Sequence, residues 1–322
     1  MQTWGLRLSC RSLYPFALIP FAQVAREARA GMKVLDVPAG GGVLSCALKA
    51  AGFDVTAADL FPEYLGKGLA KYSQGTARTL FEAMTGATLP EWLARDMFGP
   101  SGDVAAERDV RCVGADMEAR LPFEDGTFDR VACLEGIEHV VDRHRTLREL
   151  RRVLKPGGKL LITTPNLMSL RARLAFAFAG QRAFKSYVDE HTSVWGVSPV
   201  SPAGGEVGEG GGRIYHGHAF LLTYFQLRYS LYHCGLRITR LLPSNASVSS
   251  VLLSPMALGV WAGTAVSQRR AKKKFERLKR GDDGFTYKPP AGTEAPYGEM
   301  MGHLMSANLL MNATMVVEAE AR

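Results

Sequence analysis

The chain has 322 residues, enough for one large domain or two small ones, and a hydrophobic content of 47% that is ample for a packed core. Its five cysteines are widely spaced without a C-x-x-C pair, which argues against a disulfide framework or a zinc knuckle and favours a reducing cytoplasm. The net charge of +8 comes almost entirely from residues 269–280, so composition gives no broadly basic face for nucleic acid.

The N-terminal segment 1–32 is predicted to contain an opening helix that lies on the fold. Residues 13–21 are apolar and follow two arginines, which is a weak imitation of a signal peptide. Pro15 and Pro20 interrupt this run, and no convincing small-residue cleavage site follows it. We therefore do not expect a signal peptide.

Residues 33–59 predict a strand, a glycine turn, a helix and a second strand. The first strand contains Asp36 and breaks into a turn, residues 38–42, that has almost no side chains. Such glycines let the backbone approach a ligand closely beside the N-terminus of the following helix. The second strand ends at Asp59, whose carboxylate can accept both hydroxyl hydrogens of a ribose. The segment therefore predicts a nucleoside site.

The run 35–42 (LDVPAGGG) resembles the first motif of the class I S-adenosylmethionine-dependent methyltransferases. Dinucleotide-binding oxidoreductases are the competing interpretation, but their fingerprint has a glycine where Pro38 stands, and the acid at Asp36 favours a methyltransferase. The resemblance implies S-adenosylmethionine as the cofactor. It also implies a set of cofactor-binding residues in this segment: Asp36, Ala39, Gly40, Gly42, Asp59 and Leu60.

Residues 60–109 are longer than the single connecting helix that would suffice between two strands. Helices are predicted over 75–87 and 91–97, followed by a loop. We interpret the segment as a surface insertion, with a partial lid over the substrate as the alternative.

A short strand at 111–114 precedes Asp116 and Met117, and the resemblance implies that these two residues hold the adenine. The following run 121–129 (LPFEDGTFD) resembles a segment common in small-molecule methyltransferases of this class and leads into an apolar strand, 130–134.

The exit of that strand carries the candidate catalytic residues. The resemblance implies that Leu134 and Glu135 wall the reactive methyl group, and the triplet 138–140 (EHV) is similar to one in ubiquinone-type O-methyltransferases. His139, with an ordinary pKa near 6.5, could remove the proton of a hydroxyl acceptor. Alternatively, Glu138 and His139 hold the loop by hydrogen bonds to neighbouring backbone.

An amphipathic helix is predicted at 142–154, and the run 154–166 (LKPGGKLLITTPN) resembles the last core motif of the family, with a buried strand at 159–164. Beyond it, 167–184 suits a helix that packs in the core, covers the active site or rests on a lipid surface. A flexible glycine-rich loop is expected at 198–212.

The resemblance implies that His216 and His218 line the acceptor pocket, because related methyltransferases carry a histidine shortly before a Thr-capped helix near the substrate; the alternative is that both are surface loop histidines. No third ligand with recognisable spacing accompanies this H-x-H pair and methyl transfer requires no metal, so we expect no metal site. A capping box at Thr223 and Gln226 begins the next helix, and a sixth strand is predicted at 236–242.

The most apolar segment outside the sheet is 250–266, and the basic run 269–280 follows it directly. This pattern fits insertion at an anionic membrane surface, and it also fits a core-packed helix that continues into a solvated basic helix. A final strand, 313–319, would pair antiparallel in the resembled fold.

We expect an α/β fold, namely a Rossmann-like seven-stranded, mostly parallel sheet with helices on both faces, an antiparallel last strand and helical insertions. One methyltransferase domain would span 1–322. It would comprise the helical segment 1–32, a cofactor-binding core at 33–166, and substrate-side insertions with closing strands at 167–322.

The expected function is transfer of a methyl group from S-adenosylmethionine to a small-molecule or lipid-linked acceptor, at oxygen. Two alternatives stay open, namely an RNA or protein methyltransferase that holds a polyanion with 269–280, and a non-catalytic cofactor-binding module. We expect a cytoplasmic protein, with peripheral contact with an anionic membrane through 251–280 as a second expectation.

Overall fold

The computed structural model describes residues 31–40, 43–50, 52–60, 110–179, 221–244, 248–280 and 297–322. The opening helix predicted within 1–32, the two helices of the 60–109 insertion and the loop at 198–212 lie almost entirely outside these residues.

Seven strands form one sheet in the part of the chain that the structure describes, in the order β3-β2-β1-β4-β5-β7-β6. They are β1 (Lys33–Asp36), β2 (Asp54–Asp59), β3 (Arg111–Gly114), β4 (Phe128–Leu134), β5 (Leu154–Pro165), β6 (Leu236–Leu242) and β7 (Thr314–Ala321). The first five strands pair in parallel, whereas β7 pairs antiparallel with both β5 and β6. The predicted seven-stranded, mostly parallel sheet with an antiparallel last strand is confirmed.

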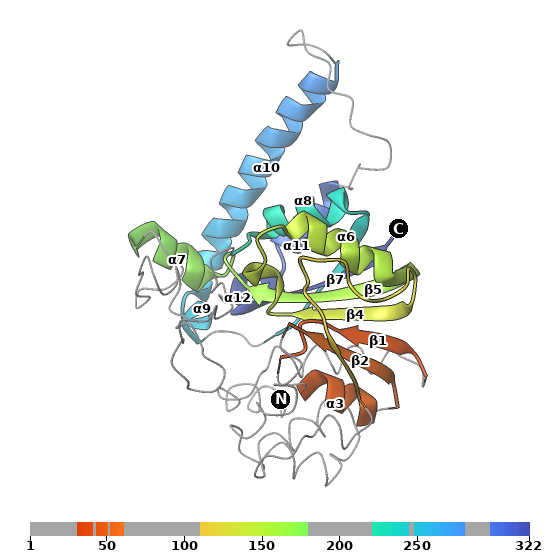
Figure 1. Ribbon diagram of the computed structural model, residues 1–322. Coiled ribbons are helices and arrows are strands. Elements are labelled where there is room, and N and C mark those ends of the chain that lie inside the picture. The colour runs from red at the N-terminus through yellow and green to blue at the C-terminus, as the bar shows by residue number, and fades with distance from the viewer. Residues whose placement is uncertain are drawn as a thin grey trace, which may run out of the picture.

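Helices cover both faces of this sheet (Figure 1). On one face lie α6 (Arg143–Val153) and α8 (Tyr224–His233), and α3 (Val43–Ala50) lies under β1 and β2 on the other. The predicted N-caps are present, because Asp142 accepts a hydrogen bond from the Arg145 N–H over 2.9 Å and Thr223 forms a complete capping box with Gln226.

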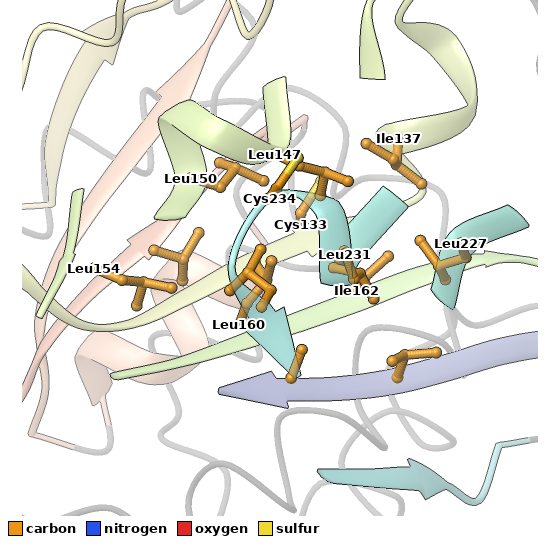
Figure 2. Packing of buried hydrophobic residues seen from close by; sticks show 14 of the residues in the cluster. Cys133, Ile137, Leu147, Leu150, Leu154, Leu160, Ile162, Leu227, Leu231 and Cys234 are labelled. Carbon is orange, nitrogen blue, oxygen red and sulfur yellow. The ribbon is translucent and has the colours of Figure 1, made fainter. Parts of the chain in front are cut away.

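The main hydrophobic core lies between the sheet and the α6–α8 pair (Figure 2). Leu147 and Leu150 of α6 and Leu231 of α8 meet Leu160 and Ile162 of β5 here, and all five side chains are 0% exposed. Burial of each Leu or Ile contributes about 1.5–3 kcal/mol, so this layer holds β4 and β5 rigidly beneath the loops that follow them.

The remaining described elements lie after β5. They are α7 (Leu170–Ala179), α9 (Val248–Leu252), a short 3-10 turn η4 (Ser254–Met256), α10 (Ala257–Arg280), α11 (Tyr297–Leu304) and α12 (Ala307–Met311). None of the described helices combines the length and the apolar composition that a membrane crossing requires.

One predicted boundary is wrong. β5 begins at Leu154, before the strand predicted at 159–164, because Leu154 pairs with Phe128, the strand bulges through a positive-φ Gly157 and pairing resumes at Lys159. The apolar segment 250–266 is divided between two helices, because η4, with Pro255 near its start, separates α9 from α10.

Candidate active site

Four parallel strands end at one edge of the sheet, and the predicted cofactor residues lie there. Asp36 at the end of β1 is in register with Ala57 of β2 and Ala132 of β4. Asp59 at the end of β2 is in register with Gly114 of β3. Open α/β sheets bind ligands at this carboxyl edge, so chain segments far apart in sequence are positioned to act on one ligand.

The glycine turn after β1 touches the end of β2. The Ala39 N–H donates to the Ala58 carbonyl over 2.9 Å, and the Gly40 N–H donates to Asp59 Oδ2 over 2.8 Å. Gly40 has φ of +53°, a conformation that favours glycine. These contacts hold the Asp59 carboxylate at the mouth of the turn, and its role toward a ribose stays a prediction.

Asp36 lies beneath the turn with only 2% of its surface exposed. The Ser45 hydroxyl of α3 donates to Asp36 Oδ2 over 2.6 Å. Burial raises the pKa of Asp36 to about 7; the Ser45 hydrogen bond opposes this rise and the Asp59 charge adds to it. The carboxyl group therefore links the end of β1 to α3, and direct contact with a cofactor stays a prediction.

The loop after β3 brings a second carboxylate close to Asp59. The Ala115 N–H donates to the Asp59 carbonyl over 2.8 Å, which joins the two strand ends. Asp116 is exposed and accepts a hydrogen bond from the Glu118 N–H over 2.8 Å, whereas Met117 is 8% exposed. Asp116 thus presents an acid at the edge expected for the adenine, and Met117 packs behind it.

The exit of β4 packs against the glycine turn. Glu135 has φ of +47°, which is uncommon for a residue other than glycine, and its N–H donates to the Thr163 carbonyl over 3.1 Å and to Thr163 Oγ1 over 3.0 Å. At Gly136, a Cβ would lie 2.4 Å from Pro38 Cδ. Gly136 was not among the residues predicted from the sequence, although a glycine directly after a strand is a signal of close backbone approach.

Glu138 and His139 follow in a short 3-10 turn, η3 (Ile137–His139). Glu138 is 0% exposed, and burial, followed by the charge of Glu135, raises its pKa well above the ordinary value. His139 is half-buried, and its N–H donates to the Gly136 carbonyl over 3.0 Å. Two carboxyl groups and an imidazole therefore flank the strand exit, and their catalytic roles stay predictions.

Leu134 ends β4 half-buried, and Leu60 follows β2 with 40% of its surface exposed. Gly42, His216 and His218 lie outside the described residues. Among the described residues, no group of three His, Cys, Asp or Glu side chains is placed to hold a metal ion.

The residues at this edge fit a nucleoside cofactor. No heavy atom of the described structure lies within 4 Å of the position that a Cβ on Gly40 would take, so the turn offers open backbone beside the carboxylate of Asp59. Asp59 and Asp116 are carboxylate acceptors on adjacent strand ends, which suits the hydroxyl and amino groups of an adenosine.

Comparison with known families agrees with this geometry. Residues 35–162 match a protein family described as a methyltransferase domain, and these residues run from β1 into β5 and contain the four strand ends. Residues 35–162 are a methyltransferase domain. For these residues the resemblance to class I S-adenosylmethionine-dependent methyltransferases is confirmed, and a domain of this class implies S-adenosylmethionine as the cofactor.

The methyltransferase domain has curated relatives. A ubiquinone biosynthesis O-methyltransferase of Xanthomonas oryzae pv. oryzae strain PXO99A is 36% identical over 155 residues, covering 48% of this chain and 50% of the relative. The protein of the same name from Xanthomonas campestris pv. campestris strain B100 is 35% identical over 155 residues, with the same coverage of 48% and 50%. The chain therefore spans about half the length of the curated relatives it matches.

Among solved structures, the chain is similar to a SAM-dependent methyltransferase from Methanosarcina mazei. The two are 20% identical, with a TM-score of 0.38, and the similarity covers 71% of this chain and 88% of the other.

Proposed function

We propose that the protein transfers the methyl group of S-adenosylmethionine to an oxygen atom of a small-molecule or lipid-linked acceptor. The observation that carries the proposal is that the Gly40 turn, Asp59, Asp116 and the Glu138-His139 strand exit meet at one edge of a methyltransferase domain. The cofactor supplies an electrophilic methyl group on a sulfonium; transfer forms an oxygen–carbon bond, breaks the carbon–sulfur bond and leaves a neutral thioether.

Seven of the predicted binding residues have a specific role in this proposal. The open backbone of Gly40, together with Gly42, admits the methionine part, and Asp59 binds the ribose hydroxyls. Asp116 accepts from the adenine amino group, with Met117 packed behind it. Leu134 and Glu135 wall the methyl group at the end of β4. The support for these roles is that the described groups share one sheet edge, where a single adenosine can reach them.

The hydroxyl proton of the acceptor must leave during transfer, and we assign its removal to His139. This half-buried imidazole follows the strand that walls the methyl group, and histidine accepts a proton near neutral pH. Glu138 is completely buried, so we assign it a positioning role in which it holds η3 next to Glu135 and Thr164. A His139→Ala variant should lose turnover at all pH values and keep its affinity for S-adenosylmethionine.

The acceptor class follows from the relatives and from the residues outside the domain match. The curated relatives are named O-methyltransferases of ubiquinone biosynthesis, and this supports an oxygen nucleophile. Residues 167–322, with helices α7 to α12, lie outside the family match, and we place the acceptor contacts there, with His216 and His218 lining the pocket.

The test is an acceptor search with the purified full chain. Methyl-labelled S-adenosylmethionine is incubated with the protein and with the combined lipid and metabolite extract of a strain that lacks it, and labelled products are identified by mass spectrometry. We expect a labelled small molecule or lipid with a methyl ether, absent when His139→Ala replaces the wild-type chain.

Two other outcomes would overturn the proposal. Label in RNA or protein, lost when residues 269–280 are neutralised, would favour the macromolecular alternative. No labelled product from any extract, despite tight cofactor binding, would favour a non-catalytic cofactor-binding module.

A further inference from the structure

Helix α10 leaves the body of the protein as a long arm (Figure 1). Its 24 residues span about 36 Å at the ordinary helical rise of about 1.5 Å per residue. Its base packs on the body of the protein, because Ala257, which is 4% exposed, forms a small cluster with Leu170 of α7 and Leu310 of α12, flanked by Val260 and Trp261.

Four apolar side chains before and within the first half of α10 are exposed. Leu252 of α9 is 76% exposed, Met256 of η4 is 48% exposed, and Leu258 and Val266 of α10 are 69% and 48% exposed. We call these four residues the apolar base. Isolated exposed apolar residues are ordinary, but these four lie on consecutive elements, with contacts between α9 and η4 and between η4 and α10, so they follow one another along one continuous segment.

The distal half of the arm is strongly cationic. Residues 269–280 contain eight basic residues and one acidic residue, a formal charge of +7 out of the +8 of the whole chain. The side chains described there are exposed, including Arg269, Lys273 and Arg277.

The apolar and cationic parts lie along one side of the helix. Residues spaced by three or four positions share a helical face, and Leu258, Ala262 and Val266 continue at this spacing into Arg269, Lys273 and Arg277. All six positions are exposed, whereas Ala257, Val260 and Thr264 on the packed side are not. A flat surface that lies along this face would contact aliphatic side chains near the base of the helix and cations farther along it.

The arm is joined to the edge of the sheet that carries the candidate active site. Asn166, directly after β5, donates from Nδ2 to the carbonyls of Leu309 and Asn312, both over 2.8 Å, and its Oδ1 accepts a hydrogen bond from the Met168 N–H over 2.9 Å. These bonds fix α7 and α12, and both helices pack against the base of α10 through Leu170 and Leu310.

We propose that α9, η4 and α10 form a docking arm for the surface of an anionic lipid bilayer, with the apolar base inserted among the headgroups and residues 269–280 bound to lipid phosphates. Charge complementarity selects this occupant over a second copy, which would bring two helices of charge +7 together. RNA would use the cations, but it would leave the exposed aliphatic side chains of the apolar base without a partner.

This docking puts the candidate active site next to the membrane, where an amphiphilic acceptor would be met. That consequence rests on the proposed function, but the binding itself does not. A cation near an anionic bilayer raises the partition coefficient about fivefold, so removal of three cations should lower it on the order of 100-fold.

The test is vesicle flotation of the purified full chain. We expect it to float with vesicles that contain 40% phosphatidylglycerol in phosphatidylcholine, and much less with pure phosphatidylcholine vesicles. The triple variant Lys272→Gln, Lys273→Gln, Lys274→Gln should lose most of this flotation. The matched control is Arg111→Gln, Arg145→Gln, Arg148→Gln, which removes three exposed positive charges from the body and should float like the wild type.

A double variant, Leu258→Ser with Val266→Ser, tests the apolar base, because it should reduce flotation at salt concentrations that screen the cations. Calorimetric titration of every variant with S-adenosylmethionine should be unchanged, which separates loss of docking from loss of the cofactor site.

Three results would overturn the proposal. They are absence of wild-type flotation with anionic vesicles, equal flotation of the lysine variant and the wild type, and tight RNA binding with no dependence on Leu258 and Val266. A chain that floats as expected without binding S-adenosylmethionine would instead refute the proposed function and leave the docking arm in place.

Discussion

The buried carboxyl of Asp36 makes the stability of the protein depend on pH in a predictable direction. Its pKa is about 7 in the folded chain and 3.8 as a reference value for the unfolded chain. Above pH 3.8 the carboxyl of Asp36 is ionised in the unfolded chain but still protonated in the folded chain, so folding requires the uptake of a proton. The free-energy cost of this uptake grows with pH until the pH exceeds the pKa of the folded chain. The group therefore lowers the free energy of unfolding by about 3 kcal/mol between pH 5 and pH 8, at about 1.4 kcal/mol per pKa unit.

Asp36→Asn removes the ionisable group, and with it this pH-dependent cost, but keeps a carbonyl oxygen that can accept the hydrogen bond from the Ser45 hydroxyl. The free energy of unfolding of the variant minus that of the wild type should therefore rise by about 3 kcal/mol from pH 5 to pH 8. Urea unfolding followed by circular dichroism at four pH values in this range measures the difference. Asp54→Asn, the same change on an exposed side chain of β2, provides the baseline. A difference that is equal at pH 5 and pH 8 would refute the reasoning.

Two further predictions concern residues that stabilise the sheet and the loop after β4. Glu318 is 3% exposed, and although burial alone would raise its pKa, hydrogen bonds from Arg240 and Thr239 lower it below the ordinary value. Glu318→Ala should therefore cost about 3–5 kcal/mol of unfolding free energy at pH 7. Because the pKa of Glu318 is lowered on folding, this cost should shrink as the pH falls below the ordinary pKa of a glutamate, 4.5, and a cost independent of pH would contradict this. Gly136→Ala should destabilise by about 1–3 kcal/mol and weaken cofactor binding, because its Cβ would meet the ring of Pro38, and normal thermal unfolding would argue against that contact.

The parts of the fold that local patterns encode were predictable from the sequence. The strand, glycine turn, helix and strand of residues 33–59 form where apolar runs, glycines and a terminal acid predict them, and Asp59 indeed meets the turn at Gly40. The caps at Asp142 and Thr223 are likewise local signals. Each cap depends on residues within about one helical turn, and each strand or helix depends on the hydrophobic pattern of its own short segment.

The contacts that the sequence could not reveal join distant segments. Gly136 fits against Pro38, and Asn166 holds the carbonyls of Leu309 and Asn312; neither pairing has a local signature. The strand β5 starts early because it pairs with Phe128, a property of the sheet and not of the LKPGG turn.

The packing of helix α10 was also not predictable from the sequence. The sequence allowed either core packing or membrane contact for 250–280, because composition does not say how far the packing reaches. The structure packs the base of the helix at Ala257, Val260 and Trp261 and leaves Leu258 exposed. Domain boundaries at 32 and 166 stay predictions.

The most direct test of the central claim is calorimetric titration of the full chain with S-adenosylmethionine. The wild type should bind, and Asp59→Ala should bind about 10- to 150-fold more weakly, because a hydrogen bond to a charged group contributes about 1.5–3 kcal/mol. Asp59→Asn, which keeps an acceptor for the Gly40 N–H, should lie between them, and Asp54→Ala at the opposite end of β2 should bind like the wild type. Equal affinity of the wild type and Asp59→Ala would contradict the cofactor site proposed at this edge of the sheet.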